Sequence, residues 1–131
     1  MSNGAVCRSG RVGVSRSWKA CERAIARYLG GERVPVTGRV RGYAPDVEHL
    51  RLAIEVKSWS QFPLRVATAM DQARKAAEWA KRRGKGDRIP IAVIHRDRTA
   101  IGNSWVVLSL ADFEDLARLP GGPLDGLEAR L

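Results

Sequence analysis

The sequence has few cysteines and histidines, and it contains no long hydrophobic run. Its two cysteines, Cys7 and Cys21, have neither the number nor the spacing of a secreted disulfide scaffold or a metal site. His49 and His95 have no cysteine or histidine partner at ligand spacing, so no zinc site is expected. No apolar run approaches the roughly 18 residues of a membrane span, and residues 1–15 do not have the pattern of a signal peptide. We therefore expect a cytoplasmic protein without membrane association.

What the sequence does have is an excess of basic residues, concentrated towards one end. The 131 residues include 23 Lys or Arg and 14 Asp or Glu, which gives a formal net charge of +9. Residues 1–41 contain nine basic and two acidic residues, whereas residues 112–131 contain two basic and five acidic ones. A polyanion is the natural partner of such a basic region, and a solubility surface is the alternative.

The length predicts one globular domain, because domains usually run to roughly 100–200 residues. Residues 1–15 are rich in Gly, Ser and Arg without periodicity, and we predict that they form a flexible basic arm. The folded domain is expected over residues 16–119. A weakly structured tail, which contains the run Pro120-Gly121-Gly122-Pro123, is expected over residues 120–131.

Periodicity and turn residues predict an alternation of helices and strands. Three helices are expected, at 17–29 with Ser15 or Ser17 as the cap, at 65–83, and at a final short segment capped by Asp112. Strands are expected at 32–36, 46–48, 52–57, 89–94 and 104–110. The order predicts an α/β fold in which one mixed central sheet is flanked by helices. The four tryptophans, which are expected mainly in the core, are Trp18, Trp59, Trp79 and Trp105.

Two carboxylates and a lysine are expected to meet on one hairpin. Because strand side chains alternate, Glu55 and Lys57 share a face of their strand while the residues between them point into the core. A hairpin folded about its midpoint places Asp46 opposite Glu55, with Cβ atoms about 5 Å apart. Facing carboxylates repel unless a cation lies between them, and Mg²⁺ takes one or two carboxylates together with waters and substrate phosphate. Lys57 would then orient the attacking water or neutralise charge on the phosphate.

A further carboxylate lies on the apolar stripe of the first helix. Trp18, Glu22, Ile25 and Leu29 follow helical spacing, so Glu22 is expected to face the core. An inward carboxylate needs a partner that offsets the cost of its desolvation. A metal or its bound water would supply one, and an ion pair with the neighbours of Arg23 or with Arg33 is an equally good alternative.

These residues carry a family resemblance. Pro45-Asp46 and Glu55-Val56-Lys57 look like the PD-(D/E)xK nuclease core. Glu22-Arg23 precedes them on a helix, followed by the segment Arg33-Val34-Pro35-Val36-Thr37-Gly38, and this order resembles the archaeal-type Holliday junction resolvases over roughly residues 18–72. The resemblance implies a restriction-endonuclease-like core and a homodimeric, Mg²⁺-dependent endonuclease, with Mn²⁺ able to substitute. Such an enzyme resolves four-way DNA junctions by paired nicks.

By resemblance, Glu22, Asp46 and Glu55 would be the acidic active-site residues and Lys57 the catalytic lysine. Thr37 stands where the family usually has a serine. The metal would be held by Asp46, Glu55, the Val56 carbonyl and Glu22. Gln72 resembles a polar residue that related nucleases place near the site. The arginines expected to contact DNA phosphates, from the Gly/Ser-rich arm, the strand after the first helix and a glycine-flanked loop, are Arg8, Arg11, Arg16, Arg33, Arg39 and Arg41.

Two other functions fit the same residues. One is a restriction-like or repair endonuclease of the same fold that acts on a different DNA. The other is a non-catalytic basic DNA-binding module, in which the carboxylates would pair with arginines. The basic segment 81–85 at the end of the second predicted helix fits DNA binding and a favourable interaction with the helix dipole equally well.

Overall fold

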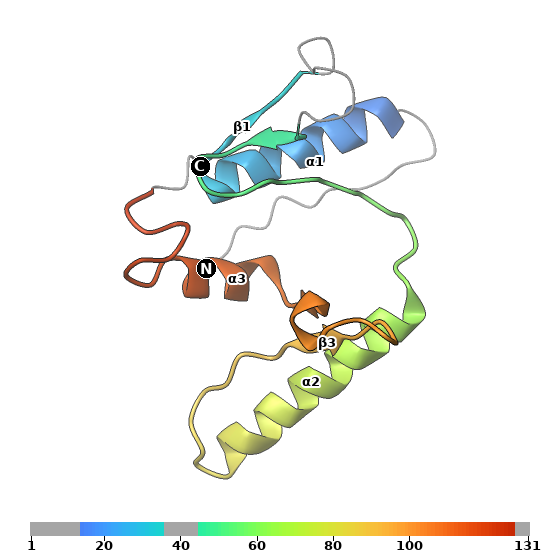
Figure 1. The fold of residues 1–131 in the computed structure, drawn as a ribbon, viewed down its shortest axis with the longest axis vertical. Helices are drawn as coiled ribbons and strands as arrows, with labels where there is room; N and C mark the ends of the chain where they lie inside the picture. The colour runs from blue at the N-terminus through green and yellow to red at the C-terminus, as the bar shows by residue number, and fades with distance from the viewer. Residues whose placement is uncertain (1–13, 36–44, 128–131) are drawn as a thin grey trace. The chain divides into compact units, whose positions relative to one another are not determined.

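The computed structural model describes residues 14–35 and 45–127, which fall into two compact units (Figure 1). Of the described residues, the first unit comprises 14–35, 45–60 and 116–127, and the second comprises 61–115. The folded domain expected over residues 16–119 contains parts of both units. Each described sheet pairs strands of its own unit, so no described sheet runs through both units.

The described elements are three α-helices, a short 3₁₀ helix and two antiparallel sheets, so the α/β class is confirmed. The sheets differ from expectation, because two separate two-stranded sheets stand in place of one mixed sheet. Residues 52–57 were expected to form a full strand and contribute a single bridge, at Ile54. This one bridge does not extend the first sheet to a third strand.

Helix α1 spans Val14–Leu29, three residues more at its start than the sequence predicted. Residues 14–16 contain neither glycine nor proline and can therefore continue the helix. The helix ends at Leu29, as predicted, directly before a pair of glycines. Gly30 has φ +75, its N–H donates to the Arg27 carbonyl and the Gly31 N–H donates to the Ala26 carbonyl, which is the Schellman motif.

The sheet of the first unit pairs β1 (Glu32–Arg33) with β2 (Val47–Glu48), and Val47 forms the bridge to Ile54. Figure 1 shows β1 beside α1. Helix α1 and this sheet pack around a core that includes Cys21, Ala26, Leu29 and Val47. Cys21 is buried, which is typical of a free cysteine.

The turn after β2 is held by a histidine, which explains how it forms without glycine or asparagine. The His49 Nδ1 accepts hydrogen bonds from the backbone N–H groups of Arg51 and Leu52, at 3.1 and 3.2 Å. Its Nε2 donates to the carbonyl of Leu29 over 2.9 Å. One ring therefore ties the turn to the end of α1 and organises the hairpin that carries Asp46 and Glu55.

Residues 118–127 are more ordered than the weakly structured tail expected from residue 120 onward. They form consecutive turns in which Leu124 is fully buried and its N–H donates to the Ala117 carbonyl over 2.9 Å. Arg51 donates to the carbonyls of Gly122 and Asp125. A buried leucine and these hydrogen bonds order a segment that its glycines and prolines suggested would be loose.

In the second unit, α2 (Leu64–Arg82) packs on the hairpin of β3 (Ala92–Ile94) and β4 (Trp105–Val107), whose strands are connected through the 3₁₀ helix η2 (Ile101–Asn103). Its buried apolar residues are few and mostly small: Met70, Ala80 and Ala92. Trp79 and Trp105 are exposed, contrary to the expectation that they lie in the core.

Helix α3 (Leu110–Ala117) begins in the second unit and is capped by Ser109 instead of by Asp112. The Asp112 N–H donates to the Ser109 Oγ over 3.1 Å, which is the N-cap arrangement. The cap and the start of the helix therefore lie three residues earlier than expected, and Leu110 joins the helix instead of the predicted strand.

Candidate functional site

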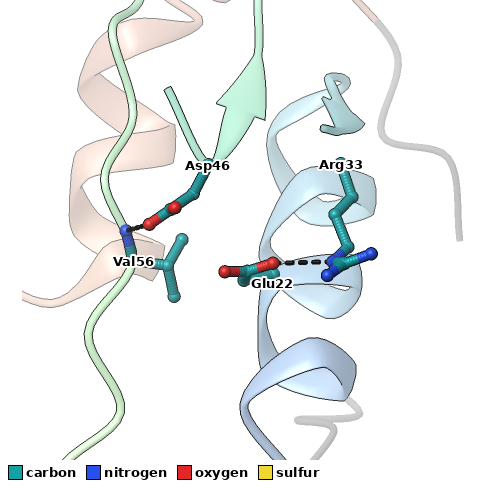
Figure 2. Close-up of polar contacts among 4 residues, drawn as sticks. All are labelled: Glu22, Arg33, Asp46 and Val56. Atoms are coloured by element: carbon teal, nitrogen blue, oxygen red, sulfur yellow. Dashed lines mark hydrogen bonds and ion pairs between the residues drawn. The ribbon is translucent and has the colours of Figure 1, made fainter. Parts of the chain in front are cut away.

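A buried ion pair joins α1 to β1 (Figure 2). The Arg33 Nε donates to the Glu22 Oε2 over 2.6 Å, and the two side chains are 13% and 4% exposed respectively. Glu22 faces inward on the same helix stripe as Leu29, as its spacing predicted. The guanidinium carbon of Arg33 also lies 5.6 Å from the centroid of the Trp18 ring. Of the two partners considered for this carboxylate, the structure contains the arginine.

Asp46, directly before β2, is a second buried carboxylate. It is 5% exposed, and its Oδ2 accepts a 2.7 Å hydrogen bond from the Val56 N–H (Figure 2). Its backbone is bonded as well, because its N–H donates to the Ile54 carbonyl and its carbonyl accepts from the Val34 N–H. The Asp46 carboxylate is therefore fixed against the segment that carries Glu55 and Lys57.

Glu55 and Lys57 lie together on the outer face of that segment. The Lys57 Nζ is 3.1 Å from the Glu55 Oε1, and both side chains are more than half exposed. Ile54 and Val56 are less exposed, so the predicted alternation is confirmed. The bridge of Val47 to Ile54 also has the predicted register, in which Glu55 is the residue opposite Asp46.

The described residues contain no group of three or more His, Cys, Asp or Glu side chains arranged to hold a metal ion. Asp46, Glu55 and the Val56 carbonyl nevertheless bring hard oxygen donors to one hairpin. Mg²⁺ commonly uses one or two carboxylates and fills its other positions with water and substrate phosphate, so these donors fit that ion. Glu22 fits less well, because binding a metal would compete with its buried ion pair to Arg33.

The remaining predicted site residues are distributed along the chain. Arg16 lies in the first turn of α1, and Gln72 occupies an exposed position on α2 in the second unit. The residues that lie outside the described part of the chain are Thr37, Arg39 and Arg41 at 36–44, and Arg8 and Arg11 at 1–13.

One contact at this site was not predicted from the sequence, namely the hydrogen bond from the Val56 backbone to Asp46. The predicted role of Val56 involved its carbonyl only. The register contained the signal, since pairing Val47 with Ile54 brings the following backbone past the residue that precedes β2. A short acidic side chain at that position can reach a strand N–H that has no ladder partner.

The chain matches no protein-family model, no curated protein and no solved structure. The resemblance to the junction resolvases therefore depends on the motif residues alone. In the described ranges, no helix is both long and apolar enough to cross a membrane.

Proposed function

We propose that this protein is a Mg²⁺-dependent DNA endonuclease that hydrolyses phosphodiester bonds. The observation that carries the proposal is the hydrogen bond from the Val56 N–H to the Asp46 carboxylate, which fixes a buried acid on the hairpin of Glu55 and Lys57. Two acids and a lysine on one hairpin are suited to a cation and a phosphate ester. The net charge of +9 supports a polyanionic substrate.

The roles of the residues follow from their chemistry. A bound Mg²⁺ would supply an activated water and neutralise negative charge on the phosphate. Asp46, Glu55 and the Val56 carbonyl would hold it, with Asp46 oriented by the Val56 N–H. The Lys57 ammonium, now beside Glu55 in solvent, would stabilise the charge that develops on the phosphate.

Arg33 would contribute a further phosphate contact. Its Nη2 is buried without a hydrogen-bond partner in the described part of the chain, while its Nε is held by Glu22. An unsatisfied buried donor is costly, and a phosphate oxygen is an acceptor that would satisfy it if the side chains that cover Nη2 moved aside. In this proposal Glu22 orients Arg33 and is not a principal metal ligand.

The preferred substrate in this proposal is a four-way DNA junction, cut by paired nicks from a homodimer within a restriction-endonuclease-like core. Substrate, dimer and core come from the resemblance of Asp46, Glu55 and Lys57 with Glu22 to the junction resolvases. Mn²⁺ is expected to replace Mg²⁺, since both are hard cations that favour oxygen ligands.

The test is the Asp46→Asn variant, assayed for nicking of a labelled four-way junction, with a fork and a duplex of the same arm sequence alongside. We expect cleavage to be lost, because the amide cannot replace the charged oxygen ligand, while DNA affinity is unchanged or slightly higher. Asp71→Asn is the matched control, since Asp71 is an exposed aspartate of α2 that pairs only with Arg74 among the described residues. Full nicking by Asp46→Asn would overturn the proposed site.

The Glu22–Arg33 pair favours a second candidate, the non-catalytic DNA-binding module, because pairing of carboxylates with arginines is what that function predicts. A metal chelator separates the two functions. A binding module holds the junction equally with chelator and with Mg²⁺ and never nicks it. The endonuclease nicks it in Mg²⁺ and stops when chelator is added.

A further inference from the structure

Helix α2 ends in a turn whose backbone groups bond to one another. The Gly84 N–H donates to the Lys81 carbonyl and the Lys85 N–H to the Ala80 carbonyl, at 3.1 and 3.0 Å, which is the Schellman motif. Gly84 has φ +71, the left-handed conformation that this motif requires of its glycine. Backbone N–H groups thus satisfy the last helix carbonyls, and basic side chains are not needed there for that purpose.

The segment 81–88, which we call the basic turn, carries a dense positive charge. Five of its eight residues are basic and one is acidic. Lys81 lies 3.5 Å from Asp87, and no other ion pair in the described part of the chain involves the basic turn. The four cations that keep their charge unneutralised, all exposed to solvent, are Arg82, Arg83, Lys85 and Arg88.

An aromatic ring holds two of these cations in place. The guanidinium carbon of Arg83 and the Nζ of Lys85 lie 4.5 and 4.8 Å from the centroid of Trp79, which is itself 43% exposed. A cation–π contact orients a cation through the ring quadrupole without cancelling its charge, as a carboxylate would. Arg83 and Lys85 are therefore positioned in advance while their N–H donors remain available.

We propose that the basic turn binds the phosphate backbone of nucleic acid, through residues different from those of the carboxylate site. The guanidinium fork of arginine matches phosphate oxygens, and the two lysines add point charges. Gly84 and Gly86 are open, because a Cβ built on either would meet no atom within 4 Å, so a sugar-phosphate backbone can approach closely. Attraction to the helix dipole does not account for Lys85 and Arg88, which lie beyond the end of α2.

The proposal takes DNA as the polyanion from the proposed function but requires no cleavage. It is tested with the variant Arg82→Ala/Arg83→Ala/Lys85→Ala. The matched control, Arg65→Ala/Arg74→Ala/Lys75→Ala, also removes two arginines and one lysine, from exposed positions earlier on α2. Affinity for a fluorescent four-way junction is measured by anisotropy over a series of salt concentrations, in chelator so that no strand is cut.

We expect the basic-turn variant to flatten the slope of log K against log salt by about two to three units and to weaken binding about tenfold or more, since each phosphate contact contributes about 0.9 to the slope. The control should change the slope by less than about one unit. Arg82→Gln/Lys85→Gln keeps the contact of Arg83 with Trp79 and should flatten the slope by about two units. Circular dichroism establishes that helix content is retained.

Equal losses in the two triple variants would overturn the proposal, because net charge alone would then explain binding. An unchanged slope in the basic-turn variants would overturn it as well, as would a loss of binding to phosphatidylserine vesicles without a loss of binding to DNA. A wild-type protein that nicks junctions but binds them independently of the basic turn refutes this proposal and leaves the endonuclease. A wild-type protein that binds junctions through the basic turn but never nicks them in Mg²⁺ supports this proposal and refutes the endonuclease.

Discussion

Among the described residues, buried charged side chains lie in the first unit and not in the second. In the first unit, Glu22, Arg33 and Asp46 lie inside and have hydrogen-bond partners. In the second unit, cations of the basic turn face solvent, and large apolar residues such as Trp105 are exposed. A buried charge requires a partner, which restricts where it can lie. An exposed charge has no such restriction and remains available to a ligand, so the first unit suits positioned chemistry and the second suits binding.

Helix ends of the same design make the contrast concrete. Both α1 and α2 finish in a Schellman motif with a glycine at positive φ. The residue after the glycine of the α1 motif is Gly31, which is buried against β2, whereas the residue after the glycine of the α2 motif is Lys85, which is exposed. The same backbone motif thus leads into a packed interior in one unit and onto a charged surface in the other.

Removing an arginine should give the largest difference between the two units in the free energy of unfolding. Arg33→Ala leaves the buried Glu22 without its guanidinium partner, and we expect a loss of about 3 to 5 kcal/mol in the free energy of unfolding. Arg74→Ala breaks an exposed pair with Asp71 and should cost less than about 0.5 kcal/mol. Urea denaturation followed by circular dichroism measures both. Similar values for the two variants would show that the interior pair is no more important than the surface pair.

Shortening a leucine should give the second largest difference in stability between the two units. Leu124→Ala removes a fully buried side chain, and we expect it to destabilise the protein by about 3 kcal/mol through lost contacts and a cavity. Leu64→Ala, at an exposed position at the start of α2, should change stability by less than about 0.5 kcal/mol. The shift in urea midpoint gives the comparison. If Leu124→Ala left stability unchanged, residues 120–127 would be better described as the weakly structured tail that the sequence predicted.

Adding one methyl group to a glycine gives the smallest of the three effects. A Cβ at Gly31 would lie 2.5 Å from the Glu48 carbonyl oxygen and 2.9 Å from the Val47 Cγ1, so backbone must move, at a cost of about 2 kcal/mol. Gly102→Ala in η2 meets nothing within 4 Å and should stay within about 0.5 kcal/mol of the wild type. Thermal melts of the two variants suffice, and equal melting temperatures would refute the close approach of α1 to β2.

The sequence predicted best where one regular pattern decides the outcome. Helical spacing correctly predicted that Glu22 faces inward, and α1 ends before the glycine pair, at the residue that was expected. The hairpin midpoint gave the register of Val47 with Ile54. In each case the relevant interaction lies within one element or between neighbouring strands, so local pattern contains the information.

The sequence was less informative where contacts between residues far apart in the chain determine the local structure. The pairing of Arg33 with Glu22, one of the partners that the sequence left open, depends on where β1 lies against α1, and the turn at His49 depends on the Leu29 carbonyl twenty residues earlier. The cap of α3 differs for a local reason, since Ser109 and Asp112 are both good capping residues and the helix starts at the earlier one. The strands are shorter than predicted because a residue with high strand propensity joins a sheet only where a neighbouring strand offers hydrogen-bond partners.

The burial of Leu124 also bears on the order in which the protein forms during synthesis. The first unit is discontinuous, since its residues 1–60 and 116–131 are separated along the chain by the whole second unit. On the ribosome, the hairpin that carries Asp46 and Glu55 emerges well before Leu124 and before the carbonyls of Gly122 and Asp125 that bind Arg51. Elements that depend on such long-range contacts close late in folding. The turn that carries Arg51 therefore gains its hydrogen bonds to Gly122 and Asp125 only after residues 122–125 have been synthesised.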